Sequence, residues 1–339
     1  MTPEILFLKQ EDVIRAGALD MPLILELAEQ SLRMWARDEL INPTKVGMVL
    51  PDAEHEESFF ISMPVYIGGS TNIAGFKWAA ESRYNITQPD LPTGVDITIL
   101  SDPKTVLPVA IMDATLITAM RTAASAGIGA KYLARSNTRR AAFVGAGIIG
   151  RTMIMAMRCA LPQLETIELY DLSQEKARAL ADEFADGPCS VRAVPDLEKA
   201  VREADLVVTM TSTRKPFLQD SWLRKDATVI QMGPNDVLPE VILNAQTRIM
   251  DNWKQLTGSK LSAVHLLSEQ GLLTEDMMTE LRYVVNGDRP GRRSEEERVV
   301  YCSLGLGAMD ILIANRLYQN ARKQGIGQTL TLWDSPKWV

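Results

Sequence analysis

One six-residue segment, Gly145-Ala146-Gly147-Ile148-Ile149-Gly150, constrains the fold of this chain more than any other. It follows the apolar run at 141–144 and precedes a stretch with helical spacing, which is the context that a dinucleotide-binding G-x-G-x-x-G segment requires. The first glycine permits a tight turn, the second lets the backbone approach a pyrophosphate, and the third lets helix and strand pack closely. The segment therefore predicts a Rossmann domain with a phosphate site at a helix N-terminus.

Polar residues after the next strands indicate which dinucleotide is bound. The predicted strand at 166–170 ends at Asp171, about 20 residues after the glycine segment, as the fingerprint requires. A carboxylate there accepts hydrogen bonds from the adenosine ribose and repels a 2′-phosphate, so we expect NAD. Arg178, in the following helix, leaves NADP open as the less favoured cofactor. Thr211 and Ser212 follow a later strand, where they either line the cofactor or form an ordinary polar loop.

The order of predicted elements indicates two domains of different character. From about residue 120 onward, strands at 141–144, 166–170, 204–209 and 228–231 alternate with helical stretches, which is typical of a parallel sheet. The earlier part contains a helix at 22–38 and several strands, with the region 58–80 broken at Gly68-Gly69 and Gly75. A final helix at about 308–323 is expected to return to the N-terminal domain. The predicted fold class is α/β, a doubly wound Rossmann sheet plus a β-rich α+β domain.

Composition excludes several classes of function. The 339 residues suit two domains, and 36 Lys and Arg against 43 Asp and Glu argue against a nucleic-acid partner. Two histidines cannot form a three-histidine metal centre, so no metal is expected and proton transfer falls to Asp, Glu, Lys or water. Three scattered cysteines, no apparent signal peptide and no apolar run of about 20 residues predict a cytoplasmic protein outside the membrane.

Five short segments follow one another along the chain: Gly75-Phe76-Lys77-Trp78, 120–124, 144–150, 286–292 and 303–310. In this order they resemble the ornithine cyclodeaminase/mu-crystallin family over nearly the whole chain. The resemblance implies that 1–119 with 312–339 binds the substrate and forms a homodimer, and that 120–311 is the Rossmann domain. It also implies an oxidoreductase that takes hydride from the Cα of an amino acid and leaves an imine to be hydrolysed, cyclised or, in reverse, reduced.

Three residues match positions that carry the chemistry in this family. Arg121 resembles the arginine that holds the substrate carboxylate, for which a guanidinium fork is suited; the alternative is a salt bridge within a helix. Lys77 resembles the lysine beside the substrate carboxylate and amine, where desolvation would lower its pKa; the alternative is a surface lysine. Asp236 resembles the aspartate that positions the amine or activates water; the alternative is helix capping before Val237.

Departures from the family pattern bear on the substrate. Lys45 falls near the place of a second carboxylate-binding arginine in cyclodeaminases, and 59–64 lacks the glutamate thought to recognise the far amine of ornithine. These features resemble the siderophore-pathway branch, which converts a glutamate conjugate into 2-oxoglutarate and 2,3-diaminopropionate. Arg289, Arg292 and Arg293 either supply charge for a second carboxylate or form a solvated basic loop. Ornithine cyclisation, cyclic ketimine reduction with NAD(P)H and non-catalytic ligand binding remain alternatives.

The predicted site thus has three parts and no metal. Lys77 and Asp236 are the catalytic candidates, and Lys45, Lys77 and Arg121 are the substrate-binding candidates. The residues expected to bind NAD are Gly145, Gly147, Ile148, Ile149, Gly150, Asp171, Thr211, Ser212, Gly233 and Gly305. The expected partners are a small amino-acid substrate and a second copy of the chain.

Overall fold

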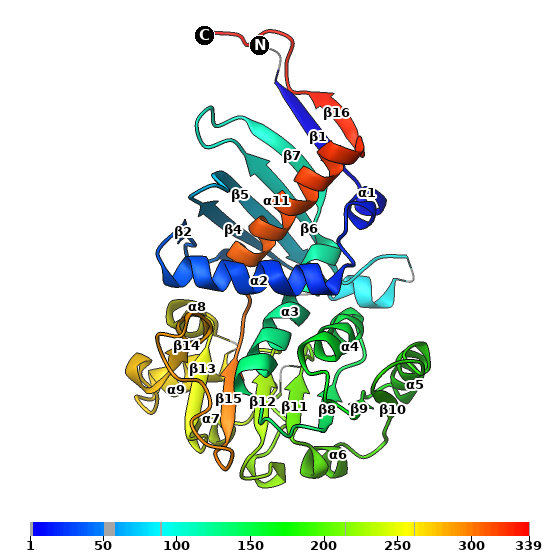
Figure 1. Ribbon diagram of the computed structural model, residues 1–339, viewed down its shortest axis with the longest axis vertical. Coiled ribbons are helices and arrows are strands. Elements are labelled where there is room, and N and C mark those ends of the chain that lie inside the picture. The colour runs from blue at the N-terminus through cyan, green and yellow to red at the C-terminus, as the bar shows by residue number, and fades with distance from the viewer. Residues whose placement is uncertain (1–2, 51–57, 89, 214, 261, 339) are drawn as a thin grey trace. The chain divides into compact units, whose positions relative to one another are not determined.

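The computed structural model describes residues 3–50, 58–88, 90–213, 215–260 and 262–338. The chain divides into two compact units, one with a mostly antiparallel sheet and one with a Rossmann-like parallel sheet (Figure 1). Unit 1 comprises Met1–Arg121 and Leu306–Val339, and unit 2 comprises Thr122–Gly305. The boundaries predicted from the sequence, at 119–120 and 311–312, stay a prediction.

A mostly antiparallel sheet forms the body of unit 1, in the order β16-β1-β7-β6-β5-β4-β2, with β3 also paired to β4. Its strands are β1 (Glu4–Leu8), β2 (Leu40–Ile41), β3 (Val46–Val49), β4 (Phe59–Ile67), β5 (Ile73–Glu81), β6 (Gly94–Ser101), β7 (Pro108–Asp113) and β16 (Gln328–Thr331). The expected break at Gly75 is wrong, because β5 continues through this residue. A Cβ atom on Gly75 would lie 2.6 Å from the carbonyl oxygen of Ile99 on β6, so the glycine permits close packing of two strands.

Helices cover one face of this sheet. They are α1 (Gln10–Arg15), α2 (Met21–Ala36) and α11 (Gly307–Gln324). Unit 1 also contains a 3-10 turn, η2 (Tyr84–Thr87), and the first residues of α3 (Thr115–Leu133). Helix α11 packs against α2 and against β4, β5 and β6 (Figure 1). Because side chains alternate along a strand, β4 buries Met63, Val65 and Ile67 on one face. The predicted return of the last helix to the N-terminal domain is confirmed.

Unit 2 is built on a parallel sheet in the order β10-β9-β8-β11-β12-β15-β13-β14. The strands are β8 (Arg140–Val144), β9 (Thr166–Tyr170), β10 (Ser190–Ala193), β11 (Leu206–Thr209), β12 (Thr228–Gln231), β13 (Thr247–Met250), β14 (Thr279–Glu280) and β15 (Val299–Cys302). Strand order reverses between β8 and β11, as in a doubly wound Rossmann sheet. The predicted fold class is confirmed, and the glycine segment lies at this switch point, where such folds bind their ligands.

The helices of unit 2 connect these parallel strands. They are α4 (Ile148–Ala160), α5 (Gln174–Glu183), α6 (Leu197–Glu203), α7 (Pro239–Leu243), α8 (Trp253–Gly258), α9 (Ala263–Glu269) and α10 (Leu281–Asn286), with 3-10 turns η3 (Asp220–Trp222) and η4 (Glu275–Met277). Helix α3 packs closely on the sheet, because a Cβ atom on Gly129 would lie 2.8 Å from the ring of Tyr301. Among the described residues, no helix is long and apolar enough to span a bilayer.

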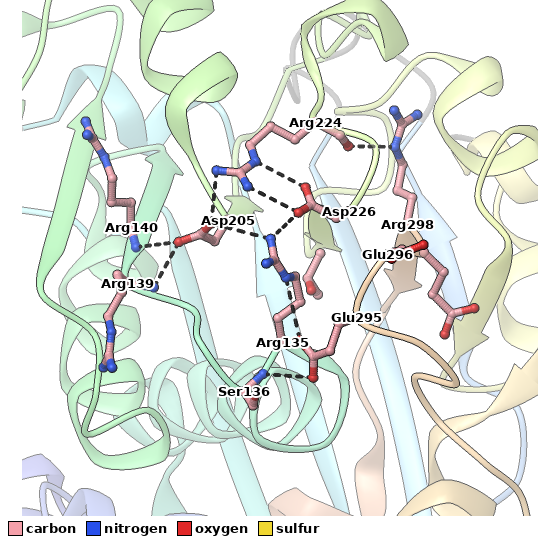
Figure 2. A network of polar contacts seen from close by, with 12 residues as sticks. Arg135, Ser136, Arg139, Arg140, Asp205, Arg224, Asp226, Glu295, Glu296 and Arg298 are labelled. Atoms are coloured by element: carbon pink, nitrogen blue, oxygen red, sulfur yellow. Dashed lines mark hydrogen bonds and ion pairs between the residues drawn. The ribbon is translucent and has the colours of Figure 1, made fainter.

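Ion pairs gather at the amino ends of strands β8, β11 and β12, as Figure 2 shows. Asp205 precedes β11 and pairs with Arg135 and, at 3.2 Å, with Arg224. Asp226 precedes β12 and pairs with the same two arginines. These shared contacts tie α3 to the loops before two strands, at the edge opposite the glycine segment. The network therefore supports the sheet where no cofactor is expected.

Arg292 belongs to the same amino edge. Its side chain donates to the carbonyl oxygen of Leu133 at 2.8 Å and to the hydroxyl of Thr228 at 2.9 Å. Burial lowers the pKa of its guanidinium, against the charge of Glu297. Both interpretations offered for the arginines at 289–293 are therefore wrong for Arg292. It is neither a solvated loop residue nor a free charge for a substrate carboxylate.

Candidate active site

The glycine segment shows why its three glycines are needed. Gly145 adopts a φ of +118°, and a Cβ atom there would lie 2.9 Å from the carbonyl oxygen of Met210. A Cβ atom on Gly150 would collide with the carbonyl oxygen of Gly145. Around Gly147 no described atom lies within 4 Å of the corresponding position. Packing thus requires the first and third glycines, while the second faces open space, as a bound pyrophosphate would need.

A hollow of about 340 Å³ lies beside this segment, between the start of α4 and the length of α5. The segment lines it with Ala146, Gly147 and Ile148, and α5 lines it with residues that include Lys176. Gly147 is the N-cap of α4, and no side chain within the described part of the chain caps this helix. The first N–H groups of α4 therefore have no capping partner, which makes the helix start suited to phosphate oxygens. The residues present fit a dinucleotide.

Asp171 lies next to the glycine segment. One carboxylate oxygen accepts a hydrogen bond from the backbone N–H of Ala146 at 2.7 Å, and the other accepts from the N–H of Ser173 at 2.8 Å. These bonds hold the carboxylate at the end of β9, beside the end of β8. Arg178 is exposed on α5. A negative charge fixed here favours ribose hydroxyls over a 2′-phosphate.

The ends of β11 and β12 bring Thr211, Gly233 and Asp236 together. The N–H of Thr211 donates to Asp236 Oδ2 at 3.1 Å, and the Thr211 hydroxyl donates to Oδ1. A side chain on Gly233 would collide with the Asp236 carboxylate. Burial raises the pKa of Asp236, although the hydrogen bonds from Thr211 act against it. Ser212 is exposed beside this group.

Helix capping does not explain Asp236. Helix α7 begins at Pro239 with Leu238 as its N-cap, and no side chain caps it. The Asp236 side chain is fully buried and turned toward Thr211 instead. Reaction at this carboxylate would therefore require the Thr211 segment to move.

Gly305 is held by a carboxylate that sequence reasoning missed. Asp251 directly follows β13, and its Oδ2 accepts hydrogen bonds from the N–H of Leu304 at 2.8 Å and of Gly305 at 2.7 Å. The hydroxyls of Tyr301 and Ser303 also donate to Asp251. Its position directly after an apolar strand, like that of Asp171, was the available signal. Asp251 fixes the turn after β15, where Gly305 has a φ of +80°.

In unit 1, two predicted cations meet at one buried carboxylate. Lys77 Nζ on β5 lies 3.0 Å from Asp310 Oδ1 on α11, and Arg121 Nε on α3 lies 3.1 Å from the same oxygen. Lys77 is only 1% exposed, so the surface-lysine interpretation is wrong. Arg121 does form an ion pair, but with a different helix. Asp310 Oδ2 is buried and has no hydrogen-bond partner among the described residues.

A second carboxylate approaches Lys77 from β6. Lys77 Nζ donates to the hydroxyl of Thr118 at 3.0 Å, and that hydroxyl donates to Asp96 Oδ2. Asp96 Oδ2 itself lies 3.8 Å from Lys77 Nζ. Burial, followed by the charge of Arg121, lowers the pKa of Lys77, against the charges of Asp310 and Asp96. The desolvation expected for Lys77 is therefore present.

The pKa values of the two carboxylates, Asp310 and Asp96, are shifted in opposite directions. Burial alone would raise the pKa of Asp310, but the charges of Arg121 and Lys77 lower it below its usual range. Burial raises the pKa of Asp96, and the charge of Lys77 only partly offsets this. Sequence reasoning assigned no role to either. The signals were the alternation along 94–101, which turns Asp96 and Thr98 to one face, and the position of Asp310 at the end of a family-like segment.

Lys45 immediately precedes β3 and is partly exposed. Val46 pairs with Ser62 on β4, and the next residue of β4, Met63, pairs with Lys77 on β5. The register therefore places Lys45 across β4 from Lys77, about 10 Å away between backbones. Lys45 therefore lies two strands from Lys77, whose side chain forms a cluster with Arg121 and Asp310.

Comparisons with known proteins agree with this geometry. The model of the ornithine cyclodeaminase/mu-crystallin family matches residues 4–325. The N-((2S)-2-amino-2-carboxyethyl)-L-glutamate dehydrogenase of Staphylococcus aureus is 30% identical over 336 residues, covering 98% of this chain and 100% of that protein. An archaeal alanine dehydrogenase dimer with bound NAD superposes with a TM-score of 0.87 at 27% identity, covering 98% and 100% of the two chains. The Δ1-pyrroline-2-carboxylate reductase of Thermococcus litoralis, with NADH and L-proline, gives 0.86 at 25% identity, covering 96% and 99%.

Proposed function

Because this chain belongs to the ornithine cyclodeaminase/mu-crystallin family, we propose that it is an NAD-dependent oxidoreductase acting on the C–N bond of an amino-acid conjugate. The proposed substrate is an N-substituted glutamate, with 2-oxoglutarate and 2,3-diaminopropionate as products. The similarity to a dehydrogenase named for such a conjugate supports this substrate. When bound, NAD accepts a hydride from the Cα of the glutamate part, which leaves an imine for water to cleave.

The cofactor is held by residues of unit 2. The uncapped start of α4 and the open space at Gly147 receive the pyrophosphate. Asp171, held by the backbone N–H groups of Ala146 and Ser173, would accept hydrogen bonds from the adenosine ribose. Thr211, Ser212, Gly233 and Gly305 lie on loops after β11, β12 and β15, at the edge where Rossmann folds carry their ligand.

The observation that carries the proposal is the burial of Lys77 and Arg121 around a single carboxylate oxygen. Arg121 contacts Asp310 through Nε, which leaves its terminal nitrogens to bind a substrate carboxylate in bidentate geometry. Lys77 binds the same carboxylate and exchanges a proton with the substrate amine, since burial lowers its pKa and so favours its neutral form. Asp236 activates the water that attacks the imine, after the Thr211 segment has moved.

Two features favour a glutamate conjugate over ornithine. The strand around 59–64 carries no carboxylate for a far amine. Lys45, across β4 from Lys77, adds a third positive charge that suits a second carboxylate. The substrate of the proposed class is rich in carboxylates, whereas ornithine has one.

The test is the absorbance of the reduced nicotinamide, with NAD and a panel of amino acids, ornithine and glutamate conjugates. Turnover of a glutamate conjugate with release of 2-oxoglutarate is expected. Conversion of ornithine to proline would overturn the substrate assignment. Activity restricted to cyclic amines, the products of cyclic imine reduction, would favour a reductase role, and so would rapid NADPH-dependent reduction of a cyclic imine. The likeness to the Thermococcus litoralis enzyme suggests this alternative.

A second copy of the chain completes the proposed enzyme. The face of the unit 1 sheet opposite α2 and α11 is apolar: Trp78 stacks on Phe60, and Val95 and Ile97 are more than 40% exposed. Large exposed apolar patches of this kind mark protein interfaces. Sedimentation should show a dimer that Ile97→Glu weakens, whereas Leu266→Glu, an equally exposed leucine of unit 2, should not. A monomeric wild-type protein would refute this part.

The cytoplasm is the proposed compartment. Cys159, Cys189 and Cys302 are all free thiols, and burial raises the pKa of Cys302 to about 12, which makes it unreactive. Proteins of oxidising compartments more often pair their cysteines. Fractionation of cells that express the protein would test this.

A further inference from the structure

We propose that Thr118 and Asp96 form a proton relay for Lys77, while Asp310 stays a fixed negative charge that positions Lys77 and Arg121. The relay rests on the proposed function, because it gives a route to the proton that an amine must lose before its Cα can give up a hydride. Neither Asp96 nor Thr118 contacts Arg121 in the described hydrogen bonds. Both are therefore separate from the carboxylate-binding part of the site.

The hydrogen bonds already point in one direction. Lys77 Nζ donates to Thr118 Oγ1 at 3.0 Å, and the Thr118 hydroxyl donates to Asp96 Oδ2. A hydroxyl that accepts from the donor and donates to the acceptor is arranged to pass a proton along. The direct distance from Lys77 Nζ to Asp96 Oδ2 is 3.8 Å, too long for a good hydrogen bond. Thr118 thus provides the hydrogen-bonded path.

The environments of the two carboxylates assign their roles. Asp310 receives Lys77 and Arg121 at the same oxygen, and these charges hold its pKa below the usual range. Asp96 has no such second cation at hydrogen-bond distance, and burial raises its pKa. When the environment shifts the pKa values of two neighbouring acids in opposite directions, the acid with the lowered pKa stays charged and the acid with the raised pKa can accept a proton. Asp96 is the proton acceptor.

The proton steps balance without any other reactant. Neutral Lys77 takes a proton from the substrate ammonium, which frees the nitrogen lone pair to form the C=N bond as hydride leaves. The resulting Lys77 ammonium gives a proton to Thr118 Oγ1 as the Thr118 hydroxyl proton passes to Asp96 Oδ2. One N–H bond breaks at Lys77, one O–H bond forms at Asp96, and Thr118 is unchanged.

Charged groups from every packed element enter this titration. Arg121 on α3 lowers the pKa of Lys77, whereas Asp310 on α11 and Asp96 on β6 raise it. Glu81 follows Lys77 on the same face of β5 and is only partly buried. Burial and the charge of Asp96 raise the pKa of Glu81.

The variants that test the relay are Thr118→Val, which removes the hydroxyl at constant volume, and Thr118→Ser, which keeps it. Thr118→Val should lower kcat about 100-fold, raise the solvent deuterium isotope effect and leave KM nearly unchanged. Thr118→Ser should restore both readouts. The matched control is Thr98→Val, because Thr98 is a buried threonine on β6 whose hydroxyl has no hydrogen-bond partner among the described residues. Wild-type kcat and isotope effect in Thr118→Val would overturn the relay.

A second measurement needs no substrate. The pKa of the Lys77 amine is followed by NMR of 15N-lysine-labelled protein, with the signal assigned from its loss in Lys77→Met. Asp96→Asn should lower this pKa further, because it removes a charge that favours the ammonium. An unchanged pKa would overturn the relay. A shifted pKa in a protein that turns over nothing on the panel would support the coupling of Lys77 to Asp96 and refute the proposed function alone.

Discussion

Asp310→Asn should destabilise unit 1 strongly, because it leaves two buried cations without their shared partner. Asp310 is fully buried, and its Oδ1 lies 3.0 Å from Lys77 Nζ and 3.1 Å from Arg121 Nε. Removing one partner of a buried ion pair costs about 3–5 kcal/mol. Asparagine keeps an oxygen that accepts hydrogen bonds, so we expect the lower end, about 3 kcal/mol of unfolding free energy.

Urea unfolding followed by tryptophan fluorescence measures this change, since Trp35 and Trp78 both belong to unit 1. The matched control is Asp12→Asn. Asp12 forms an ion pair with Arg15, whose side chain is 64% exposed, so the loss of this pair should cost below about 1 kcal/mol of unfolding free energy. A wild-type urea midpoint in Asp310→Asn would refute the reasoning.

The pH dependence of the same experiment has a defined sign. The pKa of Asp310 is lowered from 3.8, so its contribution is fully present above that value and is lost as the pH falls through the folded-state pKa. The difference between wild type and variant should therefore be constant between about pH 5 and pH 7. A difference that vanished within this range would mean that Asp310 is protonated in the folded protein.

Three further changes test the remaining assignments. Arg121→Lys keeps the charge but loses the fork, so kcat/KM for the conjugate should fall about 100-fold while the Kd of NAD stays at its wild-type value; an unchanged kcat/KM would remove Arg121 from the substrate site. Asp171→Asn should raise KM for NAD about tenfold and improve the use of NADP, as read from initial rates with each cofactor, and equal discrimination in the variant would exclude Asp171 from ribose recognition. Arg135→Met breaks pairs with Asp205 and Asp226 at the amino edge of unit 2, so thermal unfolding should show a loss of about 1–3 kcal/mol with no change in NAD affinity; weaker NAD binding would mean that this network reaches the cofactor.

Local sequence determined much of unit 2. Strand residues 166–170 and 228–231 were placed at their observed bounds, since short apolar runs between polar loops are strong strand signals in a parallel sheet. The glycine segment specified its own turn, because only glycine adopts the φ of Gly145 without strain. In unit 1 a glycine was a misleading signal at Gly75. The strand continues through this residue, and the missing side chain lets the neighbouring strand approach closely.

Residues of the candidate site could be predicted from the sequence only where they lie in a segment that resembles the family. Lys77 and Arg121 were found in that way, but nothing local showed that they share one oxygen, since Asp310 lies 233 positions after Lys77. For Asp236, the sequence left capping and catalysis open, and only the contact with Thr211 and the start of α7 at Pro239 excluded capping.

The sequence by itself determined the backbone conformations and the alternation of apolar and polar residues, because these depend on neighbours along the chain. The tertiary structure alone decided which charges are buried together. Lys77, Asp96, Thr118 and Asp310 come from β5, β6, α3 and α11, and each would be an ordinary solvated side chain on its own element. Their chemistry arises because packing buries Lys77, Asp96 and Asp310 together, and a desolvated charge is governed by the partners that the fold places beside it.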